Sequence, residues 1–91
     1  MSLMKDDVEI DIVRERERQD IKWGVQNHEP FKWLAILGEE VGEVNKACLE
    51  SFDWKKETFQ GKNLTEIRTE LVQVAAVTKA FIECIDRNYP Q

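Results

Sequence analysis

The chain has 91 residues and a formal net charge of -5; 34% of its residues are charged and 42% are hydrophobic. This length predicts one domain over residues 1–91. The hydrophobic fraction is too high for a disordered chain, and the acidic balance argues against binding to a nucleic-acid polymer or to an anionic membrane. No apolar run approaches the roughly 18 residues that a membrane span needs.

The N-terminal residues and the two cysteines indicate the cellular location of the protein. Met4 resembles a native start, so we expect residues 1–3 to be foreign to the native chain. The charged residues that follow Met4 do not form a signal peptide. Cys48 and Cys84 lie among apolar residues without a CxxC pair, which is typical of reduced thiols in a cytoplasmic protein, with a disulfide as the alternative. We therefore expect a cytoplasmic protein.

Three long helices are predicted in chain order. The first covers about residues 6–23, where alternating charges at helical spacing indicate a solvated helix. A loop precedes Pro30, which suits the first turn of a second helix over about 31–51. After a linker at 52–62, a third helix covers about 63–87, with Asn63 and Glu66 at the spacing of a capping box. No run alternates like a strand, so the fold class is all-α, a helical bundle.

Two glutamates interrupt the apolar faces of the second and third helices. At 100° per residue, Glu40 falls inside the apolar arc of the second helix, and Glu70 falls inside the arc of the third. A buried carboxylate needs a cation, and neither arc contains a basic residue. A divalent metal such as Mg²⁺ is then the candidate partner, and Glu43 follows Glu40 at a spacing that lets both bind one ion. The alternative is that these glutamates are a solvated face.

Two other features of the helices suggest close contacts or exclude a rival site. Gly38 and Gly42 destabilise a helix interior, so we expect another helix or a ligand to approach them closely. A di-iron carboxylate bundle would need Glu-x-x-His pairs, and His28 is the only histidine.

The residues around these glutamates carry a family resemblance. The segments 39–44 and 70–77, with the Trp-Gly-x-Gln-Asn segment at 23–27, resemble the MazG-like nucleoside triphosphate pyrophosphohydrolases. That family has an E-x-x-E motif followed at a distance by E-x-x-D. Glu40 and Glu43 match the first half, and Glu70 begins the second. The resemblance covers about residues 14–87.

One position departs from the family pattern. The last motif residue is Asp in the family, whereas Gln73 stands here. A neutral amide oxygen binds Mg²⁺ more weakly and does not offset its charge. Glu39 or Glu66 is a candidate to supply the missing charge. Without such compensation, the chain would be a weakened enzyme or a nucleotide-binding relative.

The resemblance implies Mg²⁺-dependent hydrolysis of (deoxy)nucleoside triphosphates to monophosphate and pyrophosphate, with Mn²⁺ as a possible substitute. It implies metal binding by four residues and a catalytic base or orienting role for Glu39. It also implies that side chains contact the phosphates of the substrate, that an aromatic ring stacks on the base, and that polar groups recognise the edge of the base. The metal ligands are Glu40, Glu43, Glu70 and Gln73, and the substrate-binding candidates are Trp23, Asn27, Trp33, Lys55 and Lys56.

The family also pairs its chains, so the resemblance implies a homo-oligomer, a dimer or a tetramer that completes the helical bundle. The apolar faces of the second and third helices fit such pairing. The alternative from another class is a non-enzymatic helical assembly or adaptor protein, with its glutamates in solvent or in ion pairs between subunits.

Overall fold

The structure is a computed structural model that describes residues 5–59 and 61–89, without the side chains of residues 5, 6, 62 and 63. It is mostly helical, with three helices packed together. The helices are α1 (Lys5–Trp23), α2 (Pro30–Ser51) and α3 (Gly61–Asn88). The three predicted helices are therefore confirmed, with ends that differ by at most about two residues. The expectation for residues 1–3 lies outside the described residues.

Local chemistry explains where α1 ends and α2 begins. Gly24 has a φ of 71°, a left-handed conformation that glycine adopts without strain, and its N–H donates to the Asp20 carbonyl at 2.8 Å. Before α2, the Glu29 carboxylate accepts hydrogen bonds from the backbone N–H groups of Phe31 at 3.0 Å and Lys32 at 2.7 Å. Pro30 lacks an N–H to satisfy at this position. The turn between the helices is thus set by the sequence.

The segment between α2 and α3 is a short hairpin, where a plain linker was expected. Strand β1 (Phe52–Asp53) pairs antiparallel with β2 (Thr58–Phe59). The Asp53 carboxylate accepts from the backbone N–H groups of Lys55 at 3.0 Å and Lys56 at 3.1 Å, as aspartates do at turns. The helix that follows begins at Gly61, so Asn63 lies inside α3 and does not precede it as the predicted cap. The side chain of Asn63 is not among the side chains that the structure describes.

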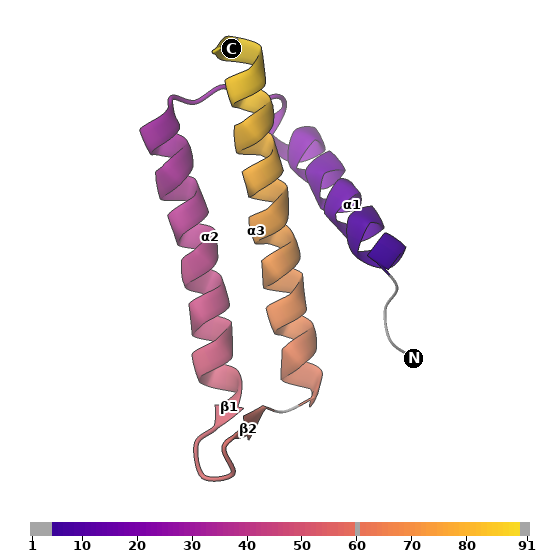
Figure 1. Ribbon diagram of the computed structural model, residues 1–91, viewed down its shortest axis with the longest axis vertical. Coiled ribbons are helices and arrows are strands. Elements are labelled where there is room, and N and C mark those ends of the chain that lie inside the picture. Colours follow the sequence, from indigo (N-terminus) through magenta and orange to yellow (C-terminus); the bar gives the residue numbers. More distant parts are fainter. Residues whose placement is uncertain (1–4, 60, 90–91) are drawn as a thin grey trace.

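Helix α3 is the centre of the packing. Figure 1 shows α2 and α3 side by side and antiparallel, while α1 crosses obliquely against α3. The core lies between α2 and α3, where Trp33 is 2% exposed and stacks on Phe81 at 5.8 Å between ring centroids. Val77, Ala80 and Cys84 of α3 complete this core. Both outer helices therefore depend on α3 for their position.

Ion pairs attach α1 to α3. Arg16 of α1 pairs with Glu83 of α3 and also with Asp20 of its own helix, and Arg68 of α3 pairs with Asp11 at 2.8 Å. The side chains of Glu15 and Arg16 are only 14% and 15% exposed. The prediction of a solvated first helix is therefore wrong for this face of α1, because α3 covers it.

The single chain leaves much of the predicted core uncovered. Leu34 of α2 and Ile82 of α3 are 56% and 53% exposed, although both lie in the apolar arcs read from the sequence. Apart from the adjacent backbone of α2, no atom of the described residues lies within 4 Å of the place where a Cβ would stand on Gly38 or Gly42. No other helix of the same chain therefore makes the expected close approach to these glycines, and an approach by a ligand or a second chain stays a prediction. No helix in the described ranges is long and apolar enough to cross a membrane.

Candidate functional site

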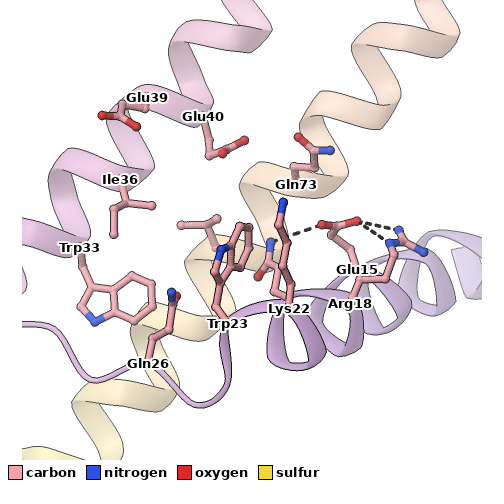
Figure 2. Close-up of a pocket in the computed structure, with 12 residues that line it drawn as sticks. Glu15, Arg18, Lys22, Trp23, Gln26, Trp33, Ile36, Glu39, Glu40 and Gln73 are labelled. Carbon is pink, nitrogen blue, oxygen red and sulfur yellow. Dashed lines mark hydrogen bonds and ion pairs between the residues drawn. The ribbon is translucent and has the colours of Figure 1, made fainter.

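A cleft of about 570 Å³ opens between α1 and α2, with α3 beneath it. Helix α1 and the loop after it form one wall, the first half of α2 forms the other, and two α3 residues form the floor (Figure 2). The lining residues are Glu15, Arg18, Gln19, Lys22, Trp23, Gln26, Trp33, Ile36, Glu39, Glu40, Gln73 and Val77. This cleft contains five of the ten residues that the sequence proposed for the site.

Glu39, Glu40 and Gln73 share the cleft, as the sequence predicts. Figure 2 shows Glu40 on α2 and Gln73 on α3 pointing toward the same space. Helix geometry accounts for this arrangement, because Glu40 lies on the face of α2 that borders the cleft and Gln73 lies on the face of α3 beneath it. Glu40 is half-buried, whereas Glu39 is exposed at the cleft wall.

Glu43 and Glu70 line an adjacent groove rather than the main cleft. This groove of about 380 Å³ lies between α2 and α3, and Glu66 lines it too. Glu43 lies three positions after Glu40, and Gln73 lies three positions after Glu70, so each pair spans about one helical turn. The predicted metal ligands therefore divide between two neighbouring spaces, with Glu40 and Gln73 in the cleft and Glu43 and Glu70 in the groove.

The pKa of Glu40 is raised above its ordinary carboxyl value of 4.5. Burial is the largest cause, since it penalises the charged form. The negative charges of Glu70, Glu43, Glu15 and Glu39 follow in that order. Glu40 is thus surrounded by like charge from all three helices, and no cation of the chain pairs with it in the described part. Glu40 therefore lies partly buried among like charges, where its place inside the apolar arc puts it.

The donor chemistry at Glu40 fits a hard cation, although the ligands are not gathered around one point. Carboxylate and amide oxygens are the ligands that Mg²⁺ and Mn²⁺ prefer. Among the described side chains, no three His, Cys, Asp or Glu residues are grouped closely enough to hold a metal ion. Mg²⁺ usually keeps several waters and takes only one or two carboxylates beside substrate phosphates, so it does not need a closed protein cage.

The two tryptophans of the cleft differ in accessibility. Trp23 ends α1 and is 55% exposed, with the Lys22 ammonium 4.7 Å from its ring centroid. Trp33 is buried, and the His28 ring packs edge-on against it at 4.9 Å. Trp33 therefore belongs both to the α2 wall of the cleft and to the core, whereas Trp23 offers an accessible aromatic face to a ligand.

Three predicted substrate contacts lie elsewhere. The Asn27 side-chain oxygen accepts hydrogen bonds from Arg87 at 3.1 Å and from Asn88 at 2.8 Å, which ties the α1–α2 loop to the end of α3. Lys55 and Lys56 are exposed in the turn of the hairpin, and neither lines the cleft. The structure therefore gives Asn27 a packing role and leaves the two lysines apart from Glu40.

The sequence analysis missed all five polar cleft residues that come from α1 and its following loop. They are Glu15, Arg18, Gln19, Lys22 and Gln26, and Glu15 is close enough to Glu40 to raise its pKa. The sequence analysis did not identify these residues because alternating charges along a helix are typical of a solvent-exposed face. A helical wheel of α1 would have placed Glu15, Arg18 and Lys22 on one side, since they are three and four residues apart.

Comparisons with models of protein families, with curated proteins and with solved structures find no match to this chain. The functional interpretation therefore depends on the residues of the cleft and on the resemblance of the sequence motifs.

We expect Glu40→Gln to stabilise the metal-free protein at neutral pH, because the variant removes a carboxylate repelled by its neighbours. The folded-state pKa of Glu40 lies above its unfolded value, so ionisation at neutral pH disfavours the folded state. As the pH falls through that raised pKa, the wild-type carboxyl takes up a proton and the difference in stability should shrink. It should vanish below the unfolded pKa. Thermal unfolding followed by circular dichroism in chelator-treated buffer measures this.

The matched control is Glu17→Gln, which removes one negative charge from an exposed position of α1 outside the cleft. It should not stabilise the protein comparably. A Glu40→Gln variant that is no more stable than wild type at neutral pH, or whose advantage grows on acidification, would contradict the account of Glu40.

Proposed function

We propose that the protein is a metal-dependent nucleoside triphosphate pyrophosphohydrolase that releases a (deoxy)nucleoside monophosphate and pyrophosphate. The observation that carries the proposal is Glu40, a half-buried carboxylate with a raised pKa that shares its cleft with an accessible tryptophan. Uncompensated negative charge suits a divalent cation, and an aromatic face beside it suits a nucleobase. The motif resemblance at Glu40, Glu43 and Glu70 supports the same reaction.

In this proposal Glu40 of the α2 wall and Gln73 of the α3 floor would hold the cation, and Glu43 and Glu70 would act from the adjacent groove. Mg²⁺, or Mn²⁺ in its place, supplies charge neutralisation at the phosphates and polarises water when it is bound. The neutral Gln73 oxygen makes this site weaker than one with a fourth carboxylate. Glu15, which faces Glu40 from α1, is a further carboxylate that compensates for the absent charge at position 73.

The chain's own groups have defined tasks in the reaction. Trp23 stacks on the base, and the Trp33 ring in the α2 wall excludes water beside it. Glu39 accepts a proton from the attacking water while the oxygen of that water bonds to the α-phosphorus. The bond from the α-phosphorus to the bridging oxygen breaks, and its electron pair leaves with pyrophosphate. General base catalysis of this kind contributes about 10²–10⁴-fold to a rate.

We expect Glu40→Gln to lower turnover at least about 100-fold, since loss of even an outer-shell partner of a metal ligand costs 10–100-fold. The assay offers each deoxynucleoside and nucleoside triphosphate with and without Mg²⁺ and measures monophosphate and pyrophosphate. Glu17→Gln on the exposed side of α1 should retain wild-type turnover.

The same assay distinguishes the proposal from its alternatives. Binding of a triphosphate without cleavage would identify a weakened nucleotide-binding relative. An absence of both cleavage and binding in the presence of metal would refute the enzyme and leave a helical assembly or adaptor protein.

We propose that the working form is a homo-oligomer, a dimer or a tetramer. Large apolar side chains on α2 and α3 stay exposed in one chain, among them Leu34, Val41, Leu49, Leu71 and Ile82. The open backbone at Gly38 and Gly42 leaves room on α2 for another helix. Free thiols at Cys48 and Cys84 support a cytoplasmic location as part of this proposal.

We expect light scattering after size-exclusion chromatography to give a multiple of the 10.7 kDa chain mass. Leu34→Lys should shift the protein toward the monomer, because a charge would be buried in the interface. Lys32→Ala, an exposed change on the same helix, is the control. A wild-type protein that remains a monomer at all concentrations tested would contradict the oligomer.

A further inference from the structure

The two walls of the cleft carry opposite charge. Helix α2 contributes Glu39 and Glu40, while α1 contributes Arg18 and Lys22 together with the single carboxylate Glu15, which leaves a net positive charge on the α1 wall. The apolar and aromatic residues gather at the end of the cleft where α1 stops, beside Trp23. A ligand that fills this cleft therefore meets an aromatic end and then a stretch between cations and carboxylates.

Lys22 is the more central of the two cations. Figure 2 shows its ammonium end pointing into the space between Glu40 and Gln73. No carboxylate in the described ranges forms an ion pair with Lys22, and its nearest recorded partner is the Trp23 ring at 4.7 Å. An unpaired ammonium beside an aromatic face is well placed to contact the phosphate nearest to a stacked base.

Arg18 lies one turn earlier on the same face of α1. Its Nε and Nη2 groups donate to a single oxygen of Glu15, at 2.9 and 2.6 Å, and the Arg18 side chain is 64% exposed. Its Nη1 group makes no hydrogen bond within the described part of the chain, so it remains available to a ligand. Four residues advance about 6 Å along a helix, which is comparable to the span of a triphosphate.

We propose that α1 binds the phosphate chain of the substrate, with Lys22 at the phosphate next to the sugar and Arg18 at the terminal phosphate. This inference rests on the proposed function and adds the orientation of the substrate: the base lies against Trp23 and the triphosphate runs back along α1. Charge-assisted hydrogen bonds from ammonium and guanidinium groups are the usual means of phosphate recognition. The assignment replaces Lys55 and Lys56, which lie on the hairpin outside the cleft.

The test is a binding measurement by isothermal titration calorimetry with Mg²⁺ present. The probes are the α,β-methylene analogues of the four common deoxynucleoside triphosphates, which resist cleavage at the α-phosphorus, and the matching monophosphates. Lys22→Gln should weaken both classes of ligand by about tenfold or more, since it removes a hydrogen bond to a charged group. Arg18→Gln should weaken the triphosphate analogue by a similar factor and leave the monophosphate unchanged.

Matched controls remove the same kind of charge from exposed positions outside the cleft. Arg14→Gln on α1 and Lys55→Gln on the hairpin should bind both probes like wild type. All four substitutions introduce glutamine, which favours helices about as well as lysine and arginine, and circular dichroism verifies the fold of each variant.

The outcomes separate this inference from the proposed function. If wild type binds an analogue but Lys22→Gln and Arg18→Gln bind it equally well, the orientation is wrong and the enzyme proposal stands. The same holds if Lys55→Gln is the variant that loses affinity, or if Arg18→Gln weakens both probes alike. If wild type binds none of the four analogues, the proposed function and this inference fail together.

Discussion

The uncompensated charge of Glu40 is the constraint on which the rest of the site depends. A carboxylate that is half-buried and faces four others is destabilising to the folded chain, and its raised pKa expresses that cost. The surroundings of Glu40 suit a bound cation better than a structural ion pair, because no described basic side chain pairs with Glu40, and Arg16 and Arg18 pair with other carboxylates. Part of the excess negative charge of the chain is thus concentrated around Glu40, where a bound cation would neutralise it.

The oblique packing of α1 on α3 places Glu40 in a cleft whose two walls differ in charge. The Arg16–Glu83 and Arg68–Asp11 pairs hold α1 against α3, and the buried Trp33 ring holds α2 there. Because α1 and α2 both pack on α3 (Figure 1), a cleft stays open between them, and Gln73 of α3 lines it. Cations from α1 and carboxylates from α2 then face each other at positions that rigid helices define.

The sequence predicted the three helices because their ends carry strong local signals, such as Gly24 and Pro30. It also predicted the placement of Glu40, because a polar residue inside an apolar arc is visible in one helix alone. The contribution of α1 could not be predicted in this way, since the burial of Glu15 depends on how α1 crosses α3, a tertiary property. Conversely, the apolar arcs overstated the core of one chain, because residues such as Leu34 remain exposed without a partner.

The central claim is that a divalent cation binds at Glu40, and the most direct test is a crystal structure of the protein soaked with Mn²⁺. Anomalous scattering locates this metal independently of the protein density. We expect a peak between Glu40 and Gln73, within about 2.0–2.6 Å of a carboxylate oxygen, a distance typical of hard cations. A protein whose anomalous peaks all lie elsewhere, with the Glu40 carboxylate bonded to a basic side chain of the same or a neighbouring subunit, would contradict the account.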